Sequence, residues 1–464
     1  MGEDERVPRE RTLMVAGPLS RRVGSHKVID DPDLLESLGR DESCCAPVAP
    51  DLAVRAHTRD DVIATLELCA GHGVPVTARG GGTGKVGGAI PARGGVVLDL
   101  TRLNSIVEIN RDDLLAVVEP GLVTGVFQQA VEDEGLFYPP DPNSLETCTL
   151  GGNAAHNAGG PRAFKYGVTR EYVLGAETVL MGGRVLRTGR RTVKGVAGYD
   201  VTSLLVGSEG TLGVFTGLTL RLVHRPPALA TLLLRFADEV AAGRAVGRIV
   251  AAGLVPRVME FMDGVLVETL RRSGAGSVPE GTGALVLAEV DGASPEIVEA
   301  ESLRLAEAAE AAGAIEVLMA SHGGERDRLW AARRGLSDAI KEAHGFKIAE
   351  DVCVPRSRAA ELLEGLRGIG ERRGLIVASY GHAGDGNYHV NLLWDDAGVD
   401  PGPALADVFG LVLSLRGTIT GEHGVGLAKR AWLPRELGSE NIALLRDLKR
   451  VFDPAGLMNP GKIF

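Results

Sequence analysis

The 464-residue sequence lacks several features that mark common classes of protein. Its five cysteines, at positions 44, 45, 69, 148 and 353, form no CxxC pair and are too sparse for a disulfide scaffold, so a reducing cytoplasm is expected. Lys and Arg number 50 against 61 Asp and Glu, a net charge of -11, which disfavours nucleic acid or an anionic membrane as the main partner. The charged N-terminus does not resemble a signal peptide, and no run of about 18 apolar residues predicts a transmembrane segment. Peripheral attachment to a membrane through a partner stays open.

Several cofactor and catalytic motifs are absent as well. Gly82–Gly87 fits GxGxxG, but the following Gly88-AIPARGG contains a proline and more glycines, which prevent the helix that a dinucleotide site needs. The loop is not a Walker A loop, because Arg79 replaces its first glycine and Val86 follows Lys85. The sequence has no HExxH motif, iron–sulfur cysteine run or haem motif. A conventional nicotinamide or nucleoside triphosphate site is therefore disfavoured.

Glycine is the residue in excess, with 63 copies, nearly twice the usual share of about 7%. It concentrates in Arg79-GGGTGKVGG, Gly151-GNAAHNAGGPRAFKYG and Gly207-SEGTLGVFTGLTLRL. Successive glycines can expose several backbone N–H groups in one concavity that binds phosphate without a helix. For the first segment alone a hairpin tip is an equal alternative, while the second is too poor in bulky residues for an ordinary strand or helix. Together they predict a large, extended, phosphate-bearing ligand enclosed by backbone.

The pattern changes near Pro226-Pro227 to clean alternation of strands and helices. Thr231–Phe236, Asp238–Ala252 and Val258–Met262 form a first βαβ-like unit, and a second follows. Two such units predict a ferredoxin-like antiparallel sheet with helices on one face. We expect an α+β fold with an irregular arm at 1–49, a first domain at 50–227, an inserted domain at 228–416 and a helical segment at 417–464 that returns to the first domain.

Three of the ten histidines fall in two short motifs bounded by glycine, Gly381-HAGDGNYHVN and Gly421-EHGVG. His382 and His389 bracket a sharp turn, so a strand, turn and strand would bring both imidazoles to one point. A histidine pair alone is more often structural. Glu422 would complete a His2Glu set, which holds a catalytic divalent metal and leaves one coordination position open.

These segments, in this order, resemble the FAD-linked oxidases of vanillyl-alcohol oxidase type, in the branch of glycolate oxidase catalytic subunits, D-lactate dehydrogenases and D-2-hydroxyglutarate dehydrogenases. The resemblance spans residues from about 50 to 464. It is carried by Pro75-VTARGGGTGKVGGAIP, Asp141-PNSLETCTLGGNAAHNAGGPRAFKYGVTREYVLG, Lys194-GVAGYDVTSLLVGSEGTLG and the two histidine motifs. It implies a two-part FAD-binding domain with an inserted substrate (cap) domain, and oxidation of a small D-2-hydroxy acid to the 2-oxo acid. Glycolate and D-lactate are the expected substrates, with D-2-hydroxyglutarate as an alternative.

The resemblance also implies which residues bind FAD. The residues expected at the pyrophosphate are Arg79, Gly80, Gly81, Gly82, Thr83 and Gly84. Those expected at the ribityl and isoalloxazine portions are Pro140, Thr147, Gly151, Gly152, Asn157 and Gly160, and those near the adenosine are Glu209, Gly210 and Gly213. Lys85 stands where the family commonly has an apolar residue. FAD is expected to be noncovalent, with His72 and His156 as alternative covalent anchors.

The same resemblance implies a metal site and a catalytic set. His382, His389 and Glu422 would bind a divalent metal, Zn²⁺ or alternatively Mn²⁺ or Fe²⁺. His423 would be the general base, because an imidazole can remove a hydroxyl proton near neutral pH. Arg333 and Lys347 match positions that contact the substrate carboxylate. Further candidate substrate contacts are Ser337, four residues after Arg333, and Asn391, two residues after His389.

Hydride would pass from C2 of the substrate to flavin N5, and the electrons would then leave to oxygen, a quinone or an acceptor protein. Companion oxidase subunits stay open. One alternative is a non-redox FAD transferase of the alkyldihydroxyacetonephosphate synthase type, which would not need the metal. Another is a noncatalytic flavin-binding subunit of a larger oxidase.

Overall fold

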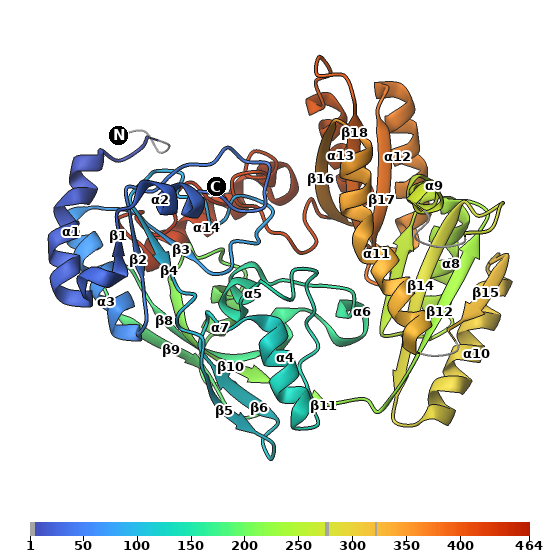
Figure 1. Ribbon diagram of the computed structural model, residues 1–464, viewed down its shortest axis with the longest axis horizontal. Coiled ribbons are helices and arrows are strands. Elements are labelled where there is room, and N and C mark those ends of the chain that lie inside the picture. The colour runs from blue at the N-terminus through green and yellow to red at the C-terminus, as the bar shows by residue number, and fades with distance from the viewer. Residues whose placement is uncertain (1–4, 274–277, 321–322) are drawn as a thin grey trace. The chain divides into compact units, whose positions relative to one another are not determined.

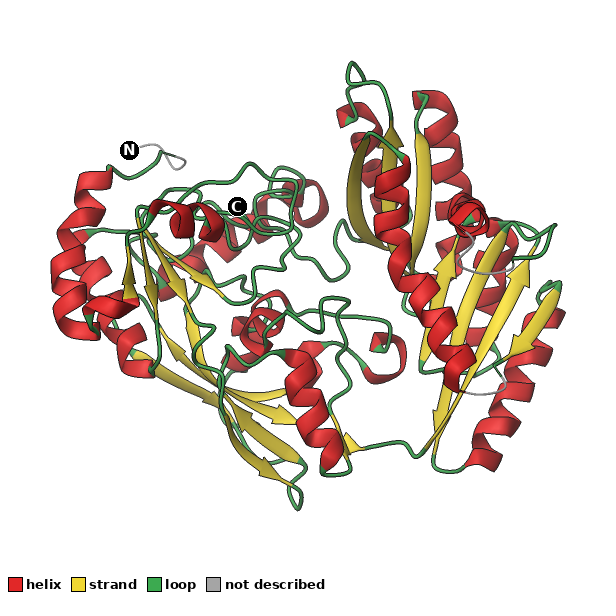
Figure 2. Cartoon of the chain, viewed as in Figure 1, coloured by secondary structure: helices red, strands yellow, loops and turns green. Residues whose placement is uncertain are grey.

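The computed structural model describes residues 5–273, 278–320 and 323–464, whose helices and strands are traced in Figure 1. The chain divides into two compact units. Unit 1 comprises Met1–Ala158, Val168–Arg225 and Glu422–Phe464, and unit 2 comprises Gly159–Gly167 and Pro226–Gly421. Each unit combines helices with sheets (Figure 2), which confirms the expected α+β class.

Residues 9–38 form mostly regular structure, whereas the sequence predicted an irregular arm at 1–49. Helix α1 (Arg9–Val23) packs on helix α3 (Arg59–His72), strand β1 (Val28–Ile29) joins the first sheet of unit 1, and helix α2 (Pro32–Leu38) follows. The buried side chains of α1 lie about one per turn: Thr12, Val15, Leu19 and Val23. Because this stripe is narrow and interrupted by arginines and Pro18, its helical periodicity is weak in the sequence.

The first sheet of unit 1 has the order β1-β2-β4-β3, and β4 pairs in parallel with β2 and β3. Its longer strands are β2 (Leu52–Arg55), β3 (Val76–Arg79) and β4 (Val96–Asp99). α3 connects β2 to β3 and begins at a capping box formed by Thr58 and Asp61. Residues 80–95 link the parallel strands β3 and β4 without helix or strand. The first glycine segment is therefore a crossover loop, and the hairpin alternative is excluded.

The second sheet of unit 1 is antiparallel, with the order β5-β6-β10-β8-β9. Its strands are β5 (Ile106–Asn110), β6 (Leu115–Val118), β8 (Val173–Val179), β9 (Val185–Gly189) and β10 (Val214–Arg221). Other elements of this unit are α4 (Thr124–Asp133), β7 (Leu136–Phe137) paired with β11 (Val223–His224), α7 (Val201–Leu205) and α14 (Leu433–Phe452). The C-terminal segment returns to the first sheet, where Val76 donates its N–H to the carbonyl of Leu457.

The second glycine segment is partly helical, contrary to the expectation from its composition. Helix α5 (Leu150–His156) is capped by Thr149, whose hydroxyl oxygen accepts a backbone N–H of the first turn at 3.3 Å. Helix α6 (Ala163–Tyr166) follows within unit 2. Gly151 lies against Pro120, where an added Cβ would stand 2.5 Å from the Pro120 Cβ. Glycine at this position permits close packing of a helix, which composition alone does not distinguish from a loop.

In its described residues, unit 2 contains one antiparallel sheet of seven strands in the order β15-β12-β14-β13-β17-β18-β16. The strands are β12 (Ala228–Phe236), β13 (Val258–Met262), β14 (Ala284–Gly292), β15 (Glu316–Met319), β16 (Phe346–Cys353), β17 (Ile376–His382) and β18 (Asn387–Trp394). β12 and β13 flank helix α8 (Glu239–Ala251), and β14 and β15 flank helix α10 (Pro295–Ala311), which confirms the ferredoxin-like part. β17, β18 and β16 extend the sheet beyond β13.

Helices cover both faces of this sheet, whereas the sequence predicted helices on one face. Figure 1 shows α11 (Gly323–Ala343) across one face and α8, α10 and α12 (Ala359–Arg373) on the other. Helix α9 (Gly264–Ser273) packs beside α11, and α13 (Gly402–Ser414) packs on α12. The second layer is needed because β13 is buried along its whole length, which requires cover on both sides.

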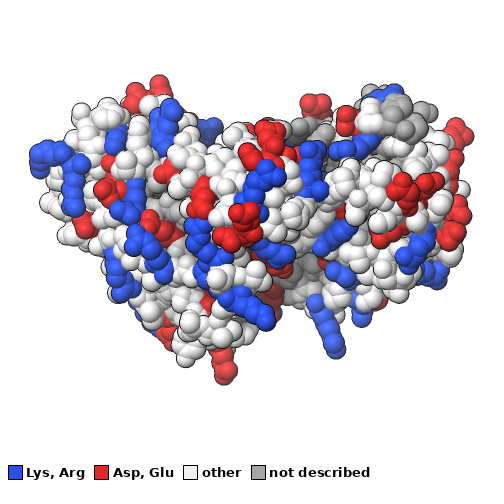
Figure 3. All heavy atoms as spheres, turned by 90° about the horizontal axis from the view of Figure 1, so that it is seen from below, with Lys and Arg blue, Asp and Glu red and all other residues white. Residues whose placement is uncertain are grey.

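The surface carries both signs of charge. On the face drawn in Figure 3, Lys and Arg side chains alternate with Asp and Glu, and neither sign dominates. Among the described residues, no helix combines the length and the apolar composition that crossing a bilayer requires.

Candidate functional site

Four predicted site residues lie on adjacent strands of unit 2: His382 on β17, His389 and Asn391 on β18, and Lys347 on β16. Tyr380 of β17 is the cross-strand partner of His389, and residues two apart on a strand point to the same side. The register of β18 with β16 places Lys347 on this side as well. The four side chains therefore project from one face of the sheet, which is the face that packs against α11.

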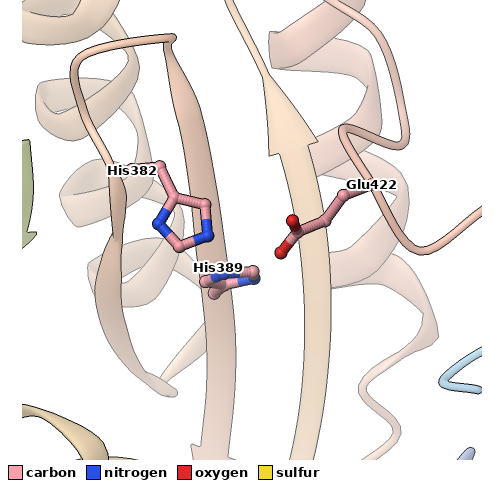
Figure 4. Close-up of side chains that lie close together, drawn as sticks. All are labelled: His382, His389 and Glu422. Carbon is pink, nitrogen blue, oxygen red and sulfur yellow. The ribbon is translucent and has the colours of Figure 1, made fainter. Parts of the chain in front are cut away.

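The three predicted metal ligands come together, as Figure 4 shows. His382, His389 and Glu422 each offer one ligand atom, and these atoms lie within 4.8 Å of one another. The histidines are 2% and 5% exposed, and Glu422 is half-buried. The two imidazole rings meet edge to face with 5.3 Å between their centroids, and the carboxylate of Glu422 points toward them.

Glu422 reaches the histidines because the residue before it is anchored on the sheet of unit 2. Gly421 donates its N–H to the buried carboxylate of Asp351 at 2.7 Å. Asp351 is itself the cross-strand partner of His389. The hydroxyl of Thr420 donates to the same carboxylate at 3.2 Å. Because Gly421 is bound to Asp351, the next residue, Glu422, lies close to His389.

Glu260 of β13 supports this cluster, and the sequence analysis did not identify it. It is fully buried and is the cross-strand partner of His382, whose Nδ1 contacts its Oε1. Its Oε2 lies 2.5 Å from the guanidinium of Arg333. Burial alone would raise the pKa of Glu260, but the adjacent His382 and Arg333 outweigh burial and lower it to about 2. The available sequence signal was a single acidic residue within an otherwise apolar strand.

The donor set fits a divalent metal. An imidazole that donates its Nδ1–H to a carboxylate presents Nε2 as the metal-binding nitrogen, and such carboxylate partners are typical of histidine ligands. His382 has this partner in Glu260. Two imidazoles and one carboxylate suit Zn²⁺, and they also suit Mn²⁺ or Fe²⁺.

The residues predicted to contact the substrate differ in how deeply they are buried. Arg333 on α11 is 4% exposed, and its guanidinium stacks on the Tyr380 ring at 4.5 Å from the centroid. Lys347 is half-buried on β16. Asn391 is fully buried and donates its amide to the carbonyls of Ala378 at 3.1 Å and His389 at 3.2 Å. Ser337 lies on α11, but its side chain is outside the described part of the structure.

The turn between the two histidine ligands packs against a segment from the first half of the sequence. An added Cβ on Gly384 would stand 2.6 Å from the ring of Phe164. The guanidinium of Arg356 lies over the same ring, 5.0 Å from its centroid. The next residues, Lys165 and Tyr166, bind the buried carboxylate of Asp291 at 2.5 and 2.7 Å. The sequence analysis missed these contacts, because they join positions more than a hundred residues apart.

The first two glycine segments meet in unit 1. A Cβ on Gly80 would collide with the hydroxyl of Thr149, and a Cβ on Gly81 would collide with the carbonyl oxygen of Thr147. Arg79 donates to the carbonyl of Arg40 at 2.6 Å, and its burial lowers its pKa. The backbone at Gly80 and Gly81 therefore approaches residues 147–149 with no room for a side chain between them. Exposed backbone of this kind is what a phosphate-binding loop requires.

Other expected flavin residues also lie at close backbone approaches of unit 1. Asn157 and Gly210 have positive φ angles of 55° and 68°, and an added Cβ on Gly213 would stand 2.7 Å from Thr178. The carbonyl of Pro140 accepts the amide of Gln128 at 2.7 Å. These positions are compatible with a ligand held by backbone, and the contacts of all the expected residues with FAD, those of Thr83, Gly84, Gly152 and Gly160 included, stay predictions.

The loop that carries the predicted base His423 is held by two residues of unit 1. Glu209 accepts the backbone N–H groups of Val425 and Gly426, both at 2.7 Å. Nδ1 of His156 lies 3.1 Å from the carbonyl oxygen of His423, to which it donates. Glu209 was expected near the adenosine of FAD, and this placement stays a prediction.

Two expectations about single residues can be placed in the structure. His72, one alternative flavin anchor, directs its Nδ1 to the carbonyl of Leu68 at 2.9 Å at the end of α3. Lys85 forms an ion pair with Glu42 of the N-terminal region. Both side chains are therefore engaged by local structure.

The sequence matches known families along most of its length. Residues 225–463 match the family described as FAD linked oxidases, C-terminal domain, and residues 50–189 match an FAD binding domain. The chain is 39% identical over 419 residues to the glycolate oxidase subunit GlcD of Bacillus subtilis, which covers 89% of each chain. It is 34% identical over 458 residues to a D-lactate dehydrogenase of Anaerostipes hadrus, which covers 96% of each chain.

Solved structures share the fold at low sequence identity. A p-cresol methylhydroxylase matches with a TM-score of 0.79 at 17% identity, over 98% of this chain and 97% of that one. An alkyldihydroxyacetonephosphate synthase matches with a TM-score of 0.76 at 18% identity, over 98% and 86%. Given these folds and the relatives similar along nearly the whole length, the resemblance inferred from the glycine and histidine motifs is confirmed: the chain belongs to the FAD-linked oxidases and is an FAD-dependent oxidoreductase.

Proposed function

We propose that this chain oxidises a small D-2-hydroxy acid, glycolate or D-lactate first of all, to the 2-oxo acid. The proposal depends on one observation, the convergence of His382, His389 and Glu422 to within 4.8 Å of one another. The names of two relatives, a glycolate oxidase subunit and a D-lactate dehydrogenase, support the substrate class. Residues 50–227 and 417–464 are assigned to the FAD-binding domain, and residues 228–416 to the substrate domain.

When bound, the metal supplies a Lewis acid for the substrate hydroxyl, and noncovalent FAD supplies the hydride acceptor at N5. Arg333 and Lys347 hold the substrate carboxylate by charge, and Asn391 and Ser337 are the further candidate substrate contacts. His423 follows the ligand Glu422 directly, so it takes the proton from the 2-hydroxyl at an imidazole nitrogen. The hydrogen bond from His156 to the His423 carbonyl fixes the backbone from which this base extends.

With FAD bound, the electrons would pass on to oxygen, a quinone or a protein acceptor. One relative is named as a subunit of glycolate oxidase, which supports a search for companion subunits. A dye-reduction assay on the purified chain with D-lactate tests whether the chain works alone. Dye reduction without any other protein would exclude a noncatalytic flavin-binding role.

The decisive experiment is anaerobic bleaching of the flavin with glycolate, both lactate enantiomers and D-2-hydroxyglutarate. We expect bleaching by a D-acid or glycolate, its loss after chelation, and its return with Zn²⁺ or Mn²⁺. His423→Asn should keep FAD but slow bleaching by about 10²- to 10⁴-fold, the usual contribution of a general base. His344→Asn, which changes a histidine paired with Asp395 instead, is the matched control. Full bleaching by the metal-free protein, or a normal rate in His423→Asn, would refute the mechanism.

A further inference from the structure

Glu260 contacts both His382, a proposed metal ligand, and Arg333, which is proposed to bind the substrate carboxylate. Its Oε1 meets Nδ1 of the metal ligand His382, and its Oε2 lies 2.5 Å from Arg333, the residue assigned to the substrate carboxylate. All three side chains are at least 95% buried. Glu260 and His382 are paired in register across β13 and β17, so the strand pairing itself fixes their contact.

These contacts belong to a closed circuit of five side chains. Arg333 stacks on Tyr380 at 4.5 Å, Tyr380 packs on His389 at 5.1 Å, and His389 meets His382 at 5.3 Å between ring centroids. Glu260 closes the circuit between His382 and Arg333. Glu260 therefore touches both a histidine ligand and the arginine.

A purely stabilising role explains Glu260 poorly. Buried ion pairs are often no more stabilising than apolar side chains of similar size, and every other residue of β13 is buried. A carboxylate in this strand has a definite chemical effect, because it orients the His382 ring and makes its Nε2 a better ligand. It also holds the Arg333 guanidinium at a fixed position beside that ring.

We propose that Glu260 is a positioning residue that holds His382 in the orientation for metal binding and Arg333 in the orientation for binding the substrate carboxylate. The inference rests on the proposed function and adds the residue that couples its two binding elements. Loss of Glu260 should weaken metal binding and substrate binding together. Loss of Arg333 should weaken substrate binding alone.

The test is titration of the chelator-stripped, FAD-loaded protein with Zn²⁺ against a chromophoric chelator. Glu260→Gln keeps the shape of the side chain but removes the charge that orients His382, so we expect Zn²⁺ affinity to fall about 10- to 100-fold. The matched control is Glu289→Gln on the neighbouring strand β14. Glu289 is 3% exposed and ion-paired with Arg257, and its described contacts do not include the histidine ligands. Its Zn²⁺ affinity should stay within about threefold of wild type.

Two further variants keep the test informative if Glu260→Gln leaves Arg333 uncompensated and does not fold. Arg333→Met should bind Zn²⁺ like wild type while raising KM for the hydroxy acid. The double variant Glu260→Gln with Arg333→Met removes both buried charges, which proteins often tolerate, and should show the full Zn²⁺ defect. Circular dichroism and FAD content measure the folded fraction for each variant.

The outcomes separate this inference from the proposed function. Stoichiometric Zn²⁺ binding that is equally tight in wild type, Glu260→Gln and the double variant overturns the positioning role and leaves the metal site standing. A Zn²⁺ defect in Glu289→Gln as large as that in Glu260→Gln also overturns it, because the effect is then general. Absence of Zn²⁺ and Mn²⁺ binding by wild type overturns the proposed function and the inference together.

Discussion

The two units build their candidate sites from different parts of the polypeptide. In unit 1, Gly80 and Gly81 approach Thr149 and Thr147 so closely that no side chain fits between the segments. The candidate metal site instead consists of side-chain head groups, two from the sheet of unit 2 and one from Glu422, supported by the buried carboxylate of Glu260. An added methyl group damages a site made of backbone, whereas a changed head group damages a site made of side chains even at constant volume. The kind of substitution that each unit tolerates should therefore differ.

The largest effect that tests this contrast is expected from Gly81→Ala. The new Cβ would collide with the Thr147 carbonyl and stand 3.3 Å from the Cα of Cys148, both backbone atoms that cannot rotate away. Overpacking of this kind costs about 1 to 3 kcal/mol, so FAD affinity should fall roughly 10- to 100-fold. The measurement is the FAD-to-protein ratio after dialysis. Zn²⁺ binding by His382, His389 and Glu422 should remain at the wild-type level.

Gly71→Ala is the control for that variant. Gly71 lies in α3, and its added methyl would meet nothing within 4 Å. Alanine should stabilise this helix by about 1 kcal/mol and leave the FAD content unchanged. Equal FAD content in both variants would show that the Gly80–Gly81 backbone does not contact the cofactor.

A methyl group can also probe the candidate metal site, with a smaller expected effect. In Gly384→Ala the new Cβ would stand 2.6 Å from the Phe164 ring and push the turn between His382 and His389. We expect Zn²⁺ affinity to fall about tenfold, within the usual cost of overpacking. Adding Phe164→Ala should restore it, and Gly335→Ala, on α11 with open space around its methyl, should have no effect. If Phe164→Ala does not restore Zn²⁺ binding, the defect of Gly384→Ala does not arise from a collision with Phe164.

A further test concerns Asp263, a buried carboxyl of unit 2 outside the candidate site. Asp263 caps α9 by accepting the N–H of Leu266 at 3.1 Å, and burial raises its pKa from 3.8 to about 7. The folded protein then binds the proton more tightly than the unfolded chain. The stability from this group is complete below about pH 3.8 and is lost as the pH rises through about 7.

Asp263→Asn keeps an oxygen for the cap and removes the titration. The free energy of unfolding should therefore decline less between pH 4 and pH 8 in the variant, by at most about 4 kcal/mol for about 3 pKa units. Denaturant unfolding at a series of pH values measures this. An unchanged pH dependence would mean that the Asp263 carboxyl is ionised in the folded protein at neutral pH.

Sequence patterns predicted the parts of the molecule that are local in the chain. The ferredoxin-like alternation after residue 228 and the histidine motif around His382 each lie within a short window. Each pattern consists of residues that are close in the sequence, so their spacing alone is enough to identify it. The metal ligands could be grouped because Glu422 also stands in a recognisable motif.

The remaining features depend on pairing across long separations. Glu260 and His382 are 122 residues apart and meet only because β13 lies beside β17. The packing of Phe164 on Gly384 likewise joins distant parts of the sequence within unit 2. Helix α5 was missed because glycine excess does not tell close helix packing from an open loop.

The membership of Gly159–Gly167 in unit 2 bears on how the protein can be dissected. A fragment cut at Pro226 and Gly421 would contain the whole sheet but not Lys165 and Tyr166, leaving Asp291 with Arg257 at 3.5 Å. The fragment would also lack Phe164, so the turn at Gly384 would lose the ring that packs against it. Unit 2 is not one continuous stretch of sequence. A fragment designed to fold as unit 2 therefore has to include Gly159–Gly167, joined to Pro226–Gly421 by a linker.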